Sequence, residues 1–128
     1  MRILALVITA SLLVGGSTAI AKHSLKAIPE VREIGKPVSC IPLQQIRESH
    51  VRSDQVIDFR ANGKKWYRNT LPSACPSLGF EERFSYKTSI SQLCSTDIIT
   101  VLYTTGGRLD GGPSCGLGQF QPVELVKP

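Results

Sequence analysis

Four cysteines are the residues of this chain whose type and spacing say most about chemistry: Cys40, Cys75, Cys94 and Cys115. They are separated by 34, 18 and 20 residues, so no close Cys-x-x-Cys pair is present. Structural zinc sites and thioredoxin-like redox sites both use such pairs, so neither is favoured. An even number of scattered cysteines indicates two disulfides in an oxidising compartment. Of the three connectivities we favour Cys75–Cys94, which brackets a turn-rich loop, and Cys40–Cys115, which joins the two ends of the folded region.

Histidine is scarce, and only His23 and His50 are present. His50 has Asp54 four residues further on, and a histidine–carboxylate pair can act as a general base. No Gly-x-Ser-x-Gly nucleophile motif accompanies it,. We therefore interpret His50 as a surface or hydrogen-bonded structural residue, and we predict no metal site and no cofactor.

Carboxylates offer a second route to catalysis, through a pair that shares acid and base roles. The candidates are Asp58, Glu81, Glu82, Asp97 and Asp110. Neighbours in sequence do not face one another, and Asp97 follows Ser95-Thr96 at a strand start, where it would cap a turn. Turn and surface roles explain all five, so no catalytic residue is predicted.

A basic cluster within one predicted hairpin is the clearest charge feature, and it comprises Arg60, Lys64, Lys65 and Arg68. The whole chain carries a formal charge of +5. Such a patch could attract an anionic polymer weakly, although a solvated strand face is the simpler interpretation. The eight aromatic residues could form a stacking platform beside these arginines, but core packing is the expected role,. Nucleic acid is not an expected partner.

The first 21 residues have the features of a cleavable secretory signal peptide. Met1-Arg2 is a positive start, residues 3–14 carry no charge, and Ala19-Ile20-Ala21 is a small-residue cleavage site,. An uncleaved membrane anchor is the alternative, but the apolar run is shorter than the roughly 20 residues that a spanning helix needs. We expect an exported protein, periplasmic or extracellular, with no transmembrane anchor after cleavage. The mature chain divides into a flexible leader (22–39), one domain (40–123) and a tail (124–128).

The elements that would position these residues are mostly strands. Alternating apolar residues predict strands over 46–51, 55–60 and 65–71. Asn62-Gly63 predicts a two-residue type I′ turn that places Trp66 opposite Phe59. The fold class expected is mainly β: about five antiparallel strands in a meander that closes to a small barrel or sandwich, stapled by two disulfides.

Further along the chain the pattern is less regular. Residues 89–93 fit a short helix, and 98–103 fit a strand buried on both faces. Residues 105–112 fit a flexible loop, and 115–123 a last strand. Gly116 and Gly118 in that strand indicate a bulge or a close backbone approach.

Several motifs in this order resemble an uncharacterised, domain-of-unknown-function family of small exported bacterial proteins. They are Leu71-Pro72, Cys75-Pro76, Phe84-Ser85-Tyr86, Leu93-Cys94-Ser95-Thr96-Asp97 and Cys115-Gly116-Leu117-Gly118-Gln119-Phe120. The resemblance covers about residues 40–123. It implies a bacterial envelope or extracellular setting and no known activity.

These features favour a non-enzymatic binding or envelope-interaction module whose partner is an envelope protein or an anionic polymer. Two alternatives remain open at this stage. One is a small hydrolase that acts on a cell-envelope polymer, with His50 or a carboxylate as base. The other is a weak polyanion-binding protein that uses the basic hairpin.

Overall fold

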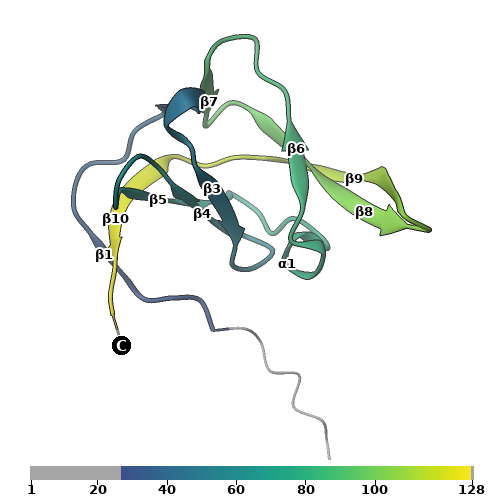
Figure 1. Ribbon diagram of the computed structural model, residues 1–128, viewed down its shortest axis with the longest axis horizontal. Helices are drawn as coiled ribbons and strands as arrows, with labels where there is room; N and C mark the ends of the chain where they lie inside the picture. Colours follow the sequence, from purple (N-terminus) through teal and green to yellow (C-terminus); the bar gives the residue numbers. More distant parts are fainter. Residues whose placement is uncertain (1–26, 128) are drawn as a thin grey trace, which may run out of the picture.

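A computed structural model describes residues 27–127 of the chain (Figure 1). The predicted signal peptide, residues 1–21, and His23 lie outside the described residues. The elements in chain order are β1 (Val31–Glu33), β2 (Cys40–Pro42), a 3₁₀ turn (Leu43–Gln45), β3 (Glu48–Val51), β4 (Val56–Arg60), β5 (Trp66–Thr70), α1 (Leu78–Glu81), β6 (Phe84–Tyr86), β7 (Gln92–Cys94), β8 (Ile98–Thr105), β9 (Arg108–Gly116) and β10 (Phe120–Leu125). None of the helices within this range is long and apolar enough to cross a membrane.

The largest sheet has five antiparallel strands in the order β1-β10-β5-β4-β3. Its β3-β4-β5 part confirms the predicted meander over residues 46–71. Residues 27–39 of the predicted flexible leader contain β1, which pairs with β10 in the register Val31 opposite Leu125, while residues 22–26 lie outside the described residues. For the same reason the domain does not end at residue 123. The two ends of the described chain therefore pair with each other, as β1 and β10, at one edge of the five-stranded sheet.

The β4–β5 turn corrects the predicted register by one residue. Ala61 N–H donates to Lys65 O at 2.8 Å, so three residues, 62–64, form the loop. Only Gly63 in this loop has positive φ, at 68°, whereas a type I′ turn needs two such residues,. Phe59 therefore lies opposite Tyr67, and Trp66 lies opposite Arg60. A one-residue shift exchanges the faces of a strand, so Tyr67 is buried and Trp66 is on the other face,.

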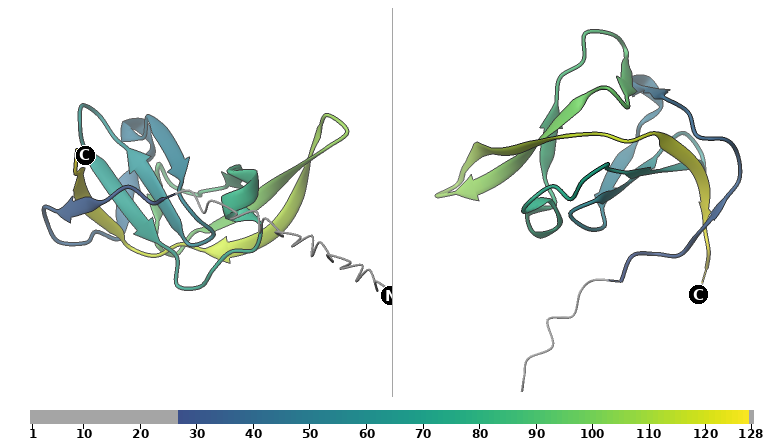
Figure 2. Two further views of the ribbon diagram at one scale, coloured as in Figure 1. Left: turned by 90° about the horizontal axis from the view of Figure 1, so that it is seen from below. Right: turned by 180° about the vertical axis from the view of Figure 1, so that it is seen from behind.

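A second, three-stranded sheet has the order β6-β8-β9. Its β8–β9 hairpin projects away from the rest of the molecule in every view (Figures 1 and 2). The expected flexible loop over 105–112 is wrong, because only Gly106-Gly107 turns the chain and β9 begins at Arg108. β8 is also not buried on both faces: Ile99 is fully buried, but Ile98 is 58% exposed.

The third sheet has only the strands β2 and β7, and its register determines which cysteines lie close enough to bond. β2 and β7 run antiparallel and place Cys40 directly opposite Cys94. The disulfides are Cys40–Cys94 and Cys75–Cys115, so the count of two is confirmed. The predicted pairs, Cys75–Cys94 and Cys40–Cys115, are wrong. β7 also replaces the short helix expected over 89–93, because strand pairing with β2 satisfies its backbone,.

The core lies between the five-stranded and the three-stranded sheets. Phe59 of β4 is fully buried, with its ring centroid 5.6 Å from that of Phe120 and 6.3 Å from that of Phe84. Both contacts are edge-to-face, and the contact with Phe84 of β6 joins the two sheets,. The strand order of each sheet is open-ended in the described residues, so closure to a barrel or sandwich stays a prediction.

A buried side-chain amide on β5 holds the backbone of the segment between β9 and β10. Asn69 has no exposed surface, and its side chain donates to Gly118 O at 2.7 Å and accepts from Gly118 N–H at 2.9 Å. A Cβ at position 118 would lie 2.1 Å from Thr70 O. The predicted close backbone approach at Gly118 is therefore confirmed, while a Cβ at Gly116 would meet open space.

Candidate functional site

A buried ion triad occupies the face of the five-stranded sheet that points away from the core. Asp58 has no exposed surface, and its carboxylate accepts hydrogen bonds from Arg52 Nε at 2.9 Å and from Arg68 Nε and Nη2 at 2.8 and 2.9 Å. Each arginine side chain is 16% exposed. Arg68 also donates to Pro29 O and so holds the segment before β1 over the triad. Every carboxylate oxygen of Asp58 is occupied, which makes this a structural cluster.

A second, exposed ion cluster lies beside it. Glu48 of β3 accepts from Arg60 Nη2 at 2.6 Å and contacts His50 Nε2 at 2.8 Å. The hydrogen bond from Arg60, followed by that from His50, lowers the pKa of Glu48 to about 2,. The ring of His50 also packs against Trp66, with centroids 5.4 Å apart.

This arrangement corrects the predicted histidine–carboxylate pair. His50 contacts Glu48 and not Asp54, whose Oδ1 instead accepts from Gly79 N–H at 2.7 Å. Alternation along β3 would have pointed to Glu48, because residues two apart share a strand face. The carboxylate partner of His50 therefore lies two residues before it in the chain, not four residues after it.

The four basic residues of the predicted polyanion patch do not form one free surface. Arg60 and Arg68 are held by the carboxylates described above. Lys64 and Lys65 are exposed, and Lys65 Nζ lies 5.3 Å from the centre of the Tyr67 ring. Cross-strand register puts Tyr67 on the face opposite to Arg60 and Arg68,. The hairpin thus presents two lysines at its tip, and its arginines act in ion pairs.

The five candidate carboxylates lie on separate parts of the fold. Asp58 is in β4, Glu81 and Glu82 are at the end of α1, and Asp110 is in the projecting β9. Asp97 accepts from Cys94 N–H at 2.7 Å, which confirms its predicted role as a turn cap. Within residues 27–127, no group of three or more His, Cys, Asp and Glu side chains is placed to hold a metal ion.

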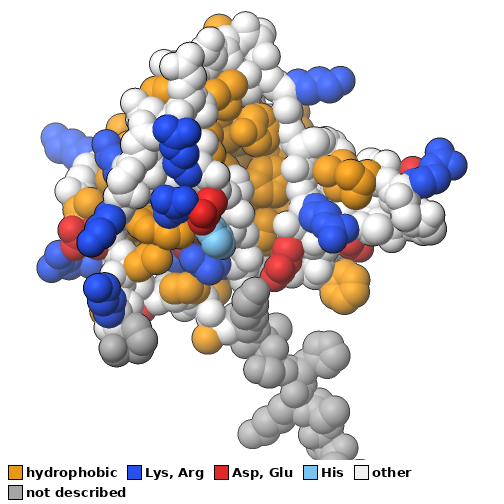
Figure 3. Space-filling model, in the orientation of Figure 1, with side chains coloured by type: hydrophobic (Ala, Val, Ile, Leu, Met, Phe, Trp, Pro, Cys, Tyr) orange, Lys and Arg blue, Asp and Glu red, His pale blue; other side chains and the backbone are white. Residues whose placement is uncertain are grey.

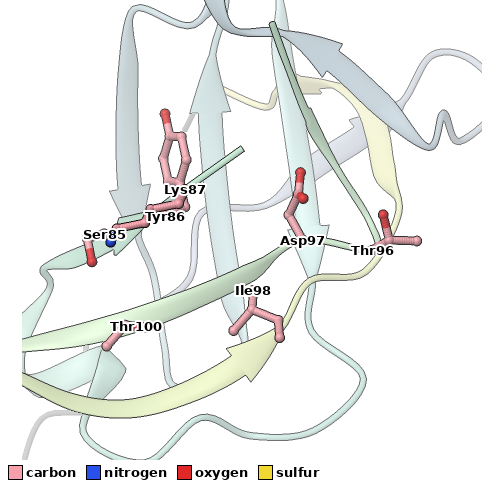
Figure 4. Close-up of a pocket in the computed structure, with 7 residues that line it drawn as sticks. All are labelled: Ser85, Tyr86, Lys87, Thr96, Asp97, Ile98 and Thr100. Carbon is pink, nitrogen blue, oxygen red and sulfur yellow. The ribbon is translucent and has the colours of Figure 1, made fainter. Parts of the chain in front are cut away.

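A cavity of about 470 Å³ lies where β6 ends and β8 begins. It is lined by Ser85, Tyr86, Lys87, Thr96, Asp97, Ile98 and Thr100. Figure 4 shows the Tyr86 ring and the Asp97 carboxylate on one side of β8, while Ser85, Ile98 and Thr100 point to the other side. Thr100 Oγ1 lies 2.9 Å from Ser114 Oγ, so a row of hydroxyls crosses the outer face of this sheet. The cavity is therefore a polar recess around the end of β6.

A hydrophobic strip runs down the front of the molecule (Figure 3). Figure 3 shows it sunk between two raised walls, in the region that Figure 1 places between β3 and β6. Four of the apolar side chains that are only partly buried against the core belong to the segments that flank this strip, namely Leu43 and Ile46 before β3 and Phe84 and Tyr86 in β6. We call the strip between β3 and β6 the front groove. Recessed apolar surface of this kind is typical of a contact site for another molecule.

The two walls of the front groove are sheet edges. β3 ends the five-stranded sheet and β6 ends the three-stranded sheet. Arg52 N–H donates to Val56 O, so the backbone groups of Arg52 point toward β4. Backbone direction alternates along a strand, so the backbone groups of His50 and Glu48 point toward β4 as well. The backbone groups of Ser49 and Val51 consequently face away from the sheet, toward the groove.

The same alternation applies to β6. Leu102 N–H donates to Arg83 O, which makes Ser85 the next residue whose backbone pairs with β8,. Phe84 and Tyr86 therefore direct their backbone N–H and C=O groups into the groove, while their side chains point toward the core side. Among the described residues, no strand pairs with either of these edges. No pattern in the sequence predicts this site, because it depends on two strands that end different sheets.

Comparisons of the chain with protein-family models, with curated proteins and with solved structures found no match. The resemblance to an uncharacterised family of exported proteins stays a prediction. The function is accordingly argued from the geometry of the site alone.

Proposed function

We propose that the mature protein is an exported, non-enzymatic binding module that uses the front groove to contact an envelope partner. The observation that carries the proposal is the apolar strip sunk between two strand edges whose backbone groups are unpaired. The two disulfides support an oxidising location, in agreement with the predicted signal peptide,. A bound segment would also supply the predicted closure toward a barrel or sandwich.

The ionisable groups support binding over catalysis. The Asp58 carboxylate is saturated by two arginines, and Glu48 and His50 are engaged with each other beside Arg60. A general base needs a free lone pair within reach of a substrate proton, together with a group that binds the substrate. The proposed hydrolase and polyanion functions therefore have weaker support from the geometry than the groove does.

Site-specific photocrosslinking in the native envelope tests this function. A photoreactive phenylalanine analogue replaces Tyr86 in the groove, and in a matched variant it replaces Phe80, which is 87% exposed on α1. We expect one recurrent adduct from position 86, identified by mass spectrometry, and none of it from position 80. Ser49→Arg, which places a cation at the groove wall, should abolish the adduct. Equal adducts at both positions, or none at position 86, would contradict the proposed function.

A further inference from the structure

We infer that the occupant of the front groove is an extended peptide segment of a partner protein, which adds a strand between β3 and β6. This inference rests on the proposed function and deepens it. The first argument comes from the backbone groups that line both walls. Ser49 and Val51 on one side, and Phe84 and Tyr86 on the other, present N–H and C=O groups at the spacing of a strand,. An extended chain offers matching groups along both of its edges.

The side chains of the walls define what the peptide must carry. Cross-strand register puts Ser49 and Val51 on the same face as Phe59, and Phe84 lies edge-on to that same ring. Side chains alternate along a strand, so every second residue of the peptide would point at this aromatic floor. The residues between them would point to solvent. The peptide should therefore have apolar residues at positions i, i+2 and i+4.

Charge places one further requirement on the peptide. β3 runs down and β6 runs up in Figure 1, so the start of β3 and the end of β6 lie at the same end of the groove. Arg47 immediately precedes β3 and Lys87 immediately follows β6, and both are exposed. Arg47 donates to the neutral Asn62 side chain, which leaves its charge uncompensated there. One end of the bound peptide would lie beside Arg47 and Lys87, and both cations would attract an acidic residue at that end.

Other occupants match these features less well. A helix or a lipid chain offers no row of backbone groups to the two walls. A folded second copy could bring one of its own strand edges to one wall, but it would leave the other wall unpaired. An extended segment satisfies both walls and the apolar floor together, which is why we commit to it.

A random 12-residue peptide library displayed on phage is a suitable probe, with the oxidised mature protein as bait. We expect enriched sequences with alternating apolar residues and an acidic residue near one end. For the strongest synthetic peptide, methylation of a single backbone nitrogen should weaken binding at least tenfold at consecutive central positions, because successive N–H groups of an extended chain face the two walls in turn. Ser49→Arg should remove binding, whereas Ser114→Arg, on the outer face of the three-stranded sheet, should leave it unchanged.

The charge requirement has its own test. The double variant Arg47→Glu, Lys87→Glu should weaken the acidic peptide at least fivefold and should lose the preference for an acidic end. Apolar residues enriched at helical spacing, N-methyl effects at alternate positions only, or a library that yields no binder would each overturn the addition of a strand between β3 and β6. If position 86 still gives its specific photoadduct in any of those cases, the binding function stands and only the nature of the occupant is wrong. Loss of the photoadduct would refute both.

Discussion

Replacing Asp58 by Asn is expected to be among the most destabilising isosteric changes in this domain. The carboxylate is fully buried and accepts three hydrogen bonds from Arg52 and Arg68. An asparagine keeps one acceptor oxygen but turns an NH₂ donor toward a guanidinium that also only donates. Breaking a buried ion pair by removing one partner costs about 3–5 kcal/mol. Each arginine keeps 16% of its side-chain surface in water, so we expect the lower end, about 3 kcal/mol,.

The assay is urea denaturation of the oxidised protein at neutral pH, followed by tryptophan fluorescence and circular dichroism. Asp58→Asn should lower the free energy of unfolding by about 3 kcal/mol, which corresponds to a fall in Tm of about 15 °C for a domain of this size. Asp110→Asn, a matched change on the exposed hairpin, should stay within about 0.5 kcal/mol of wild type,.

A second variant separates loss of charge balance from general damage to the fold. The triple change Arg52→Met, Asp58→Leu, Arg68→Met replaces the whole triad by apolar side chains and should recover more than half of the lost stability. A loss below about 1 kcal/mol for Asp58→Asn, at an unchanged dependence on urea concentration, would refute the view of Asp58 as a buried counter-ion. A triple variant no more stable than Asp58→Asn would refute it as well.

Three further outcomes follow from the same structure. Glu48 has a folded pKa of about 2, below its ordinary 4.5, so its contribution is complete above pH 4.5 and is lost as the pH falls toward 2,. The stability difference between wild type and Glu48→Gln should therefore shrink over that range in urea titrations, and a difference that grows would contradict this. Gly118→Ala should destabilise by about 2 kcal/mol or more, because its Cβ would meet Thr70 O, and a neutral result would disprove the close approach,. Removing the Cys40–Cys94 bond by serine substitution should cost about 4 kcal/mol from its 54-residue separation, and a non-reducing peptide map should recover that pair,.

Local signals predicted the parts of the fold that local chemistry determines. The alternating residues of 46–71 and the Asn62-Gly63 turn indicated the meander, because neighbouring strands need only a short connection. Even there the register was off by one, since a loop of two residues and a loop of three use the same Asn-Gly signal. The turn cap at Asp97 and the close approach at Gly118 were predictable for the same local reason.

Features that depend on distant partners were missed. β1 has three residues and is stabilised by β10, more than 90 positions away, so no pattern in its own sequence marks it. The disulfides follow from the pairing of β2 with β7, which spacing alone does not determine. The front groove likewise exists because two sheets end side by side. These properties arise from tertiary packing, which single-sequence periodicity does not encode.

The order of the disulfides along the chain has a consequence for resistance to proteolysis. The two cystine loops, 40–94 and 75–115, overlap, since each contains one cysteine of the other. A protease that cuts one peptide bond anywhere between residues 40 and 115 therefore leaves two fragments that are still covalently joined. Such a nicked molecule keeps its mass on a non-reducing gel and can keep its strands in place. The chain can lose its continuity at a single point without coming apart, and reduction is needed to release the pieces.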